Sequence, residues 1–353
     1  MLAAAVILSV NAQAASLQES LDLETLTDAL PEETREQMDS LTPETLPGAD
    51  ALEKLWGTAA EMMRTELRSV TKTASAMLAV CLIVSMTEAL KLGQSQEQCV
   101  ILAGAAAIGT AGLTDLDSYL RIGTESLHSA ADYAKAVLPV LSSAAAAGGA
   151  VTGAAARYAA TAMFLSLLLD TADRIIVPCI CGLAALSVAD AAVGNNMLKS
   201  AKKLLKRVCE LLLSVMCLAF TAWLGLSGVV SDPADALAAR AAKTAISTAL
   251  PVVGGILSDA AGTVAAAAGV LRGCVGVFGI LAVAFICVKP FVSLGVRYLV
   301  YKLSGVICCC VSDKRLSNLV EDLGGCFGLI LALNGAGALM LFISLYSLIR
   351  TAV

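Results

Sequence analysis

The sequence predicts an all-α, polytopic membrane protein of about seven to nine spans, preceded by a short acidic helical arm that lies outside the cytoplasm. Three observations predict this class. Of 353 residues, 58% are hydrophobic and 15% are charged, whereas soluble domains hold about 45–50% apolar and about 25% charged residues. Apolar stretches long enough to cross a bilayer recur along the chain. Carboxylates gather near its beginning.

The first 73 residues predict an exported segment. Residues 2–10 are apolar and are followed by small residues, the pattern of a secretory signal peptide over 1–14. Its n-region is truncated, because no Lys or Arg precedes the apolar run; the alternative is the start of a buried helix. Residues 15–73 carry 13 acidic and 5 basic residues, a net charge of −8, which leaves 16 acidic and 19 basic residues (+3) for the rest. We therefore predict an exported acidic arm over 15–73.

Residues 74–353 predict a multi-span transmembrane domain. Within it, residues 158–194 could also form one helical hairpin broken near Pro178. The predicted spans are 74–90, 98–113, 136–156, 158–177, 177–194, 208–230, 273–300 and 323–349, with a weaker apolar stretch at 250–271.

The basic residues predict the orientation of these spans. Cytoplasmic loops carry an excess of Lys and Arg, and residues 195–207 hold the densest cluster, so we predict a cytoplasmic basic loop there. An anionic phospholipid or a partner could also bind this segment. Residues 231–235 then lie outside and residues 313–315 inside. The cations of the basic segment are Lys199, Lys202, Lys203, Lys206 and Arg207.

Charged residues inside apolar segments are candidate functional residues, because a charge is costly in lipid. Glu88 lies near the inner end of the first span, where it can reach the headgroups. Asp170 and Arg174 are four residues apart, with Asp173 beside them, so they can neutralise each other and line either a wet cavity or an interfacial turn. The remaining two, which we expect to face protein or water, are Lys289 and Arg297.

Enzymatic, metal-dependent and nucleic-acid-binding functions are not predicted. Gly225-Leu-Ser-Gly228 matches a serine protease motif, but the single histidine, His128, lies in a polar connection, and such a serine needs a base within reach. Adjacent thiols at Cys308–Cys310 point in different directions on a helix, which disfavours a metal site. No basic patch with interleaved aromatic residues indicates nucleic acid binding. We expect no enzyme activity and no cofactor.

The second half of the chain resembles the stage III sporulation protein AE family. The matching features are Leu250–Ala260 (LPVVGGILSDA), Arg272, Gly273–Gly279, Pro290 and Tyr301–Leu303. The resemblance implies a membrane component of the channel apparatus between mother cell and forespore in endospore-forming bacteria. It implies a location in the outer forespore membrane, with the arm facing the intermembrane space and other membrane proteins of the complex as partners. No catalytic residues carry over from the family.

The segment 250–272 is the candidate pore or subunit-contact element. Its Pro and Gly residues suit irregular backbone, which membranes tolerate only where protein or a wet cavity surrounds it, so we expect a re-entrant or broken segment. An ordinary amphipathic helix on the outer face is the alternative. The residues of this motif are Pro251, Gly254, Gly255, Ser258 and Asp259.

Two other functions compete with a channel subunit. A self-sufficient secondary transporter would show repeated broken helices, and the only counterpart of the Pro-Gly-Gly segment is a weak one at Pro139 and Gly148-Gly149. A scaffold would recruit partners through the arm. Small-residue motifs such as Gly324-x-x-x-Gly328 permit close helix contact, within one chain or in a homo-oligomer.

Overall fold

The computed structural model describes residues 30–32, 34–35, 48–89, 94–147, 151–249 and 254–350, with side chains mainly over 53–87, 95–137, 162–223 and 279–343. Every long element in these residues is a helix, so the all-α prediction is confirmed for them. The elements are α4 (Gly48–Ala89), α5 (Gln94–Ala147), α6 (Val151–Thr171), the π-helical turn η1 (Ala172–Ile176), α7 (Val177–Val193), α8 (Asn196–Ala249), α9 (Gly254–Val311) and α10 (Lys314–Arg350).

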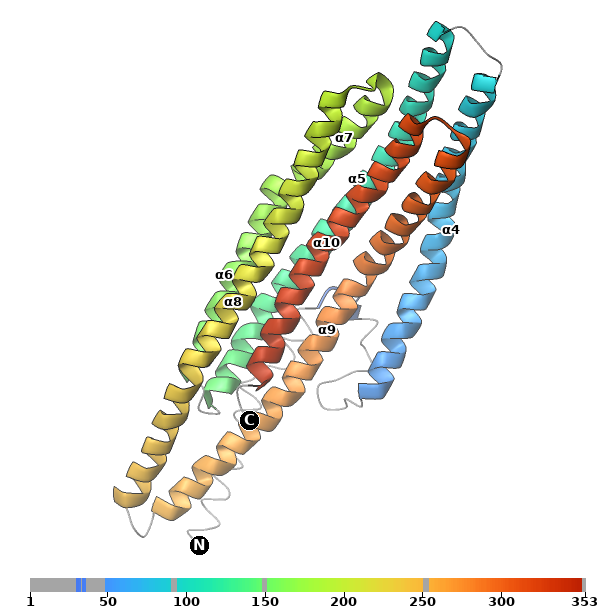
Figure 1. Cartoon of the computed structure of the whole chain (residues 1–353). Coiled ribbons are helices and arrows are strands. Elements are labelled where there is room, and N and C mark those ends of the chain that lie inside the picture. The colour runs from blue at the N-terminus through green and yellow to red at the C-terminus, as the bar shows by residue number, and fades with distance from the viewer. Residues whose placement is uncertain are drawn as a thin grey trace.

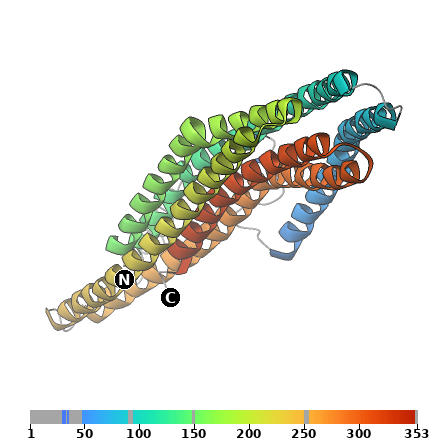
Figure 2. The same ribbon diagram turned by 45° about the horizontal axis from the view of Figure 1, so that its top comes forward.

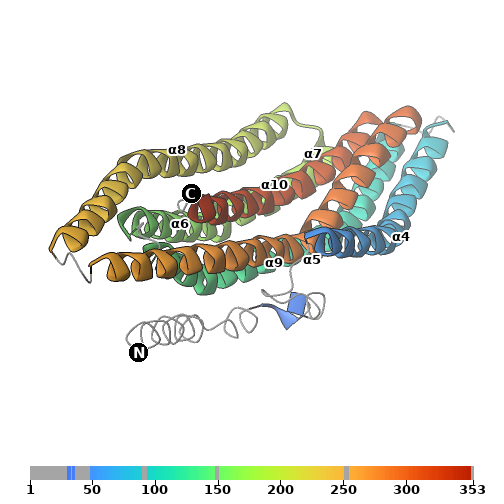
Figure 3. The ribbon, with the colours of Figure 1, turned by 90° about the horizontal axis from the view of Figure 1, so that it is seen from below.

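The helices form one elongated antiparallel bundle (Figure 1). Helices α5 and α10 lie between the group α6, α7 and α8 on one side and α4 and α9 on the other, as the turned view also shows (Figure 2). From below, α6 and α10 lie between α8 and α9 over much of their length, and the end of α8 approaches the beginning of α9 (Figure 3). The core follows α10, whose buried Leu323, Phe327 and Leu333 face the neighbouring helices.

Five helical segments among the described residues are long and apolar enough to cross a membrane: Glu53–Thr87, Ser95–Val137, Ala162–Val193, Gly279–Val311 and Lys314–Ile343. This count is lower than the seven to nine spans that the sequence predicts. The helices are also longer than a span requires. The 58 residues of α9 measure about 87 Å, against about 30 Å for the hydrocarbon core of a bilayer.

Single helices occupy regions where the sequence predicts two spans each. α5 runs without interruption through the polar residues 114–135, which the sequence assigns to a connection. The hairpin near Pro178 is not formed either: η1 leads directly into α7, with Pro178 in its first turn. A proline ring clashes with the carbonyl four residues earlier in an α-helix, and the wider π-helical turn relieves that clash.

The basic segment predicted to be a loop is instead the beginning of α8. Gly194 ends α7 in the left-handed conformation (φ 72°) and donates its N–H to the carbonyl of Asp190 at 2.7 Å. Such a glycine is the usual C-terminal cap of a helix. The Asn195 side chain then accepts the N–H of Met197 at 3.0 Å, which caps α8. Lys and Arg favour helix, so the cations continue α8 rather than a loop.

Helices α4 and α9 and the continuous α6–η1–α7 segment all end at the same end of the bundle (Figure 1). The basic segment 195–207 and residues 313–315 therefore lie at that end. The beginning of α4 and the end of α8 lie at the opposite end (Figure 1). Which of these ends faces the cytoplasm stays a prediction of the positive-inside rule.

Close contact between α9 and α10 depends on the motif Gly324-x-x-x-Gly328. A Cβ atom at Gly324 would lie 3.0 Å from Cβ of Tyr301 and 3.3 Å from the backbone nitrogen of Lys302; at Gly328 it would lie 3.0 Å from the Tyr298 ring. Backbone atoms cannot move aside as a flexible side chain can. The motif is thus an intramolecular contact, as sequence analysis allows.

Gly324→Ala is expected to destabilise the bundle by about 1–3 kcal/mol, because the added methyl group overpacks the α9–α10 contact. Gly325→Ala is the matched control, since nothing lies within 4 Å of a Cβ at that position. There the gain in helix propensity, about 1 kcal/mol, should raise the melting temperature. Thermal unfolding of both purified variants in detergent would test this; equal shifts would contradict the close contact.

Candidate functional site: buried charge clusters

A central charge cluster joins three helices inside the bundle. It consists of Glu66 on α4, Asp115 on α5 and Arg297 on α9. Arg297 is the largest fully buried side chain among the described residues, with 1% of its surface exposed. Since an uncompensated charge in such a place would cost several kcal/mol, its partners decide whether α4, α5 and α9 can pack there.

The guanidinium group of Arg297 reaches both carboxylates. Its Nε donates to Oδ1 of Asp115 at 3.3 Å, and Nη1 donates to Oε2 of Glu66. Nη2 lies 3.4 Å from the hydroxyl oxygen of Ser69. The Cζ atom of Arg297 lies 3.2 Å from the centroid of the Tyr119 ring, a cation–π contact.

Two carboxylates against one guanidinium leave an excess negative charge, which hydroxyl groups stabilise. Ser293 donates to Oε1 of Glu66 at 2.9 Å, and Tyr119 donates to its Oε2 at 3.1 Å. Tyr301 donates to Oδ2 of Asp115 at 2.9 Å. Hydrogen bonds to an ionised group are about twice as strong as neutral ones. These hydroxyl groups therefore supply hydrogen bonds to the carboxylate oxygens in addition to those from the guanidinium group.

A second cluster, again of one cation and two carboxylates, lies at the basic end of the bundle. Lys202 on α8 is 9% exposed, and its Nζ lies 2.8 Å from Oδ2 of Asp190 on α7 and 2.5 Å from Oδ2 of Asp322 on α10. Burial lowers the pKa of Lys202, but the hydrogen bonds that its ammonium group donates to Asp190 and Asp322 outweigh this effect, so its pKa is raised. This basic-end cluster connects α7, α8 and α10.

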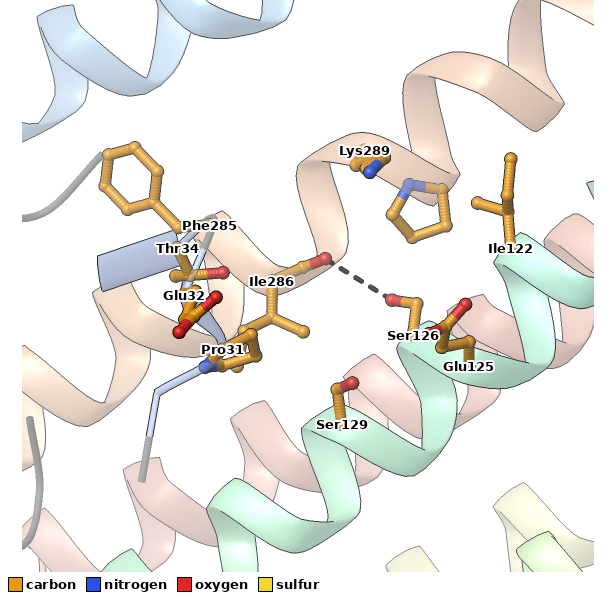
Figure 4. A pocket seen from close by; sticks show the side chains of 11 residues that line it. Pro31, Glu32, Thr34, Ile122, Glu125, Ser126, Ser129, Phe285, Ile286 and Lys289 are labelled. Carbon is orange, nitrogen blue, oxygen red and sulfur yellow. Dashed lines mark hydrogen bonds between the residues drawn. The ribbon is translucent and has the colours of Figure 1, made fainter. Parts of the chain in front are cut away.

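A hollow of about 340 Å³ lies where Pro290 interrupts the hydrogen bonding of α9 (Figure 4). Proline has no N–H to donate to the carbonyl of Ile286, four residues earlier. The hydroxyl of Ser126 on α5 donates to that carbonyl instead, at 3.3 Å. Lys289, which is half-buried, and Glu125 line the same hollow. The sequence-predicted cation Lys289 thus lines a half-open hollow with both polar and apolar walls.

Comparison with known proteins connects this bundle to a family. The family model described as stage III sporulation protein AE matches residues 44–352. The chain belongs to the stage III sporulation protein AE family. Stage III sporulation protein AE of Bacillus subtilis (strain 168) is 24% identical over 190 residues, which are 53% of this chain and 47% of that protein. The aligned region thus spans about half the length of that relative. No solved structure matches the chain.

The family match includes both charge clusters, because it extends from the beginning of α4 to the end of α10. The role in sporulation that the resemblance implies is thereby supported at the level of the family. Membership does not by itself assign a role to any residue of the two clusters. The role of these residues is therefore inferred from the contacts that they make.

The other predicted intramembrane charges lie apart from the two clusters. Asp170 and Arg174 are 70% and 82% exposed, with Nε of Arg174 3.9 Å from Oδ1 of Asp170. Oδ2 of Asp173 in η1 lies 3.2 Å from Nε2 of His128. His128 lies within helix α5 rather than in the connection that the sequence predicts. Of these residues, His128, Asp170 and Asp173 line a hollow of about 300 Å³ between α5 and α6. The side chain of Glu88 is outside the described residues.

The arrangement around His128 does not supply a nucleophile–base pair. Ser166 lines the same hollow, but its hydroxyl donates to the carbonyl of Met163 at 2.9 Å. Acyl transfer needs a hydrogen bond between nucleophile and base, and the described contacts contain none between Ser166 and His128. The absence of enzyme activity remains an expectation.

The motif of the resemblance lies mostly outside the described structure. Pro251 falls outside it. Gly254, Gly255, Ser258 and Asp259 belong to the first turns of α9, which continues to Val311 as one helix, and their side chains are not described. The re-entrant character of 250–272 therefore stays a prediction, as do the signal peptide at 1–14 and the exported arm over 15–73.

Sequence reasoning selected Arg297 but missed its partners. Glu66 was assigned to the exported arm and Asp115 to a polar connection, and both lie within long helices beside Arg297. One signal was available: Glu66 follows Met62 and Met63 and precedes Leu67 and Val70 in an amphipathic stretch. A carboxylate so close to an apolar stripe can face the interior if a cation meets it there.

Proposed function

We propose that this protein is a non-enzymatic, multi-pass subunit of the membrane complex that connects mother cell and forespore during endospore formation. Its family membership over residues 44–352 carries the proposal. Five apolar helices of spanning length support a location in the membrane. The partners would be other membrane proteins of that complex, and the membrane would be the outer forespore membrane of the mother cell.

The charge clusters support a structural rather than a catalytic role for the interior. In the central cluster every charged group contacts an opposite charge, and hydroxyl groups fill the remaining positions. Charges paired in this way fix the positions of helices relative to one another. A subunit that must keep its shape while partners assemble on it would use such pairs.

The orientation of the bundle gives the first test. The ends of α7 and α9 lie together with the basic segment, which we place in the cytoplasm by the positive-inside rule. Reporter fusions after residues 50, 205, 240 and 318 should report outside, inside, outside and inside. An inside result at residue 50 would invert the proposed membrane orientation and would contradict the exported arm.

Spore formation gives the second test. In the endospore-forming host, Asp259→Ala and Pro251→Leu should each stop forespore development without lowering the amount of protein, because the segment 250–272 would no longer line a pore or contact a subunit. Asp235→Ala, also acidic to neutral but outside the motif, is the control and should sporulate. Normal spore yield from both motif variants would contradict the proposal.

A self-sufficient secondary transporter is the second candidate function, because buried ionisable groups such as Arg297, Glu66 and Asp115 also mark ion pathways in membranes. Reconstitution of the purified protein into vesicles distinguishes a transporter from a channel subunit. Solute uptake into vesicles by the purified protein alone would favour the transporter. Dependence on other proteins of the complex would favour the subunit.

A further inference from the structure

A basic hollow of about 310 Å³ lies among α7, α8, α9 and α10 at the end of the bundle where α7 and α9 end. Five lysines and three carboxylates line it. Cations are thus in excess in the lining of the hollow. It is separate from the central charge cluster.

The carboxylates in the hollow are already paired. Asp190 and Asp322 contact Lys202, and Oε1 of Glu321 lies 2.8 Å from Nζ of Lys302. Three cations on one face of α8 remain: Lys199, Lys203 and Lys206. Lys206 lies 3.9 Å from Glu210, both half-exposed, and such pairs are weak. Within the described residues neither Lys199 nor Lys203 forms an ion pair.

An exposed apolar stripe on α8 begins at Leu204, the residue after Lys203, and continues along an adjoining face of the helix. It consists of Leu204, Val208, Leu211, Val215 and Leu218, which are 37–69% exposed. Leu204 lies with Lys203 and Lys206 in a second, shallower hollow. From Leu204 to Leu218 the helix rises about 21 Å, compared with about 15 Å for the hydrocarbon of one leaflet. Charge at one end and apolar length beyond it match the form of a lipid molecule.

We propose that α8 binds an anionic phospholipid, with the phosphate group on Lys199, Lys203 and Lys206 and an acyl chain along the α8 apolar stripe. Basic groups at the cytoplasmic surface are where anionic headgroups are recognised. A second copy of this chain is disfavoured on the stripe, since Lys203, Lys206 and Arg207 beside it would face the same cations of the copy. The proposal does not rest on the channel function.

Binding of phosphatidylglycerol to the purified full chain in uncharged detergent, measured by native mass spectrometry, tests the site. The double variant Lys199→Gln/Lys203→Gln should bind this lipid about thirtyfold more weakly, since each lysine near a headgroup contributes about 1 kcal/mol and a factor of ten corresponds to about 1.4 kcal/mol. Phosphatidylcholine should bind weakly to both proteins. Both lysines are exposed, so the double variant should keep the wild-type circular dichroism spectrum.

The control variant Lys72→Gln/Lys314→Gln removes the same charge from exposed positions outside the hollow and should bind phosphatidylglycerol as the wild type does. Equal weakening in both double variants would show unspecific charge attraction and overturn the proposal. Full competition by inorganic phosphate at the same concentration would assign the lysines to free phosphate rather than to lipid. A wild-type dimer that Leu211→Arg converts to a monomer would assign the stripe to a second copy.

Discussion

Arg297→Leu is expected to cost the bundle about 3–5 kcal/mol, the largest single-residue effect that the structure predicts. The substitution leaves Glu66 and Asp115, 19% and 13% exposed at their side chains, without a cation. It also removes the cation–π contact with Tyr119. We expect a sharply lower melting temperature in detergent and little protein in membranes, because α4, α5 and α9 can no longer pack around two unpaired carboxylates.

The control for Arg297→Leu is Arg174→Leu, which removes an arginine from an exposed ion pair and should change stability by less than about 1 kcal/mol. Adding Glu66→Gln and Asp115→Asn to Arg297→Leu should recover much of the lost stability, since the interior then holds no net charge. A triple variant no more stable than Arg297→Leu would show that the loss comes from packing rather than from unpaired charge.

Lys202→Met should have the second largest effect, about 2–4 kcal/mol, because it leaves Asp190 and Asp322 facing each other without their shared cation. Here α7, α8 and α10 should separate at the basic end. Thermal unfolding in uncharged detergent measures the loss, and Lys203→Met, the adjacent exposed lysine, is the matched control. Similar melting temperatures for the two variants would contradict the pairing of Lys202.

The pH dependence of the Lys202 contribution follows from the direction of its pKa. Because the folded pKa is raised above the usual lysine value of about 10.4, the contribution is fully present below that pH and is lost as pH rises through the folded pKa. Between neutral and mildly alkaline pH, the difference in stability between wild type and Lys202→Met should therefore stay constant.

Arg297 and Lys202 show how far sequence reasoning reached. An arginine in an apolar segment has to meet protein or water, so its importance is visible without a structure. Its partners are 231 and 182 residues away in the chain, a separation at which one sequence carries no pairing information. Lys202 was read as one of five topology-determining cations, and only the packing of α7 and α10 against α8 separates it from Lys203.

Composition and the recurrence of apolar stretches were enough to predict an all-α membrane protein, and the residues from 250 to 303 were enough to indicate its family. The fold class and the family could be predicted because each depends on local sequence. Long apolar stretches have to leave water wherever they occur, and the residues of a family motif lie close together in the chain. The merging of predicted spans into long helices and the two buried charge clusters were decided only by tertiary structure. A helix continues through polar residues, and a buried charge is tolerated, when neighbouring helices supply partners that no local stretch of sequence contains.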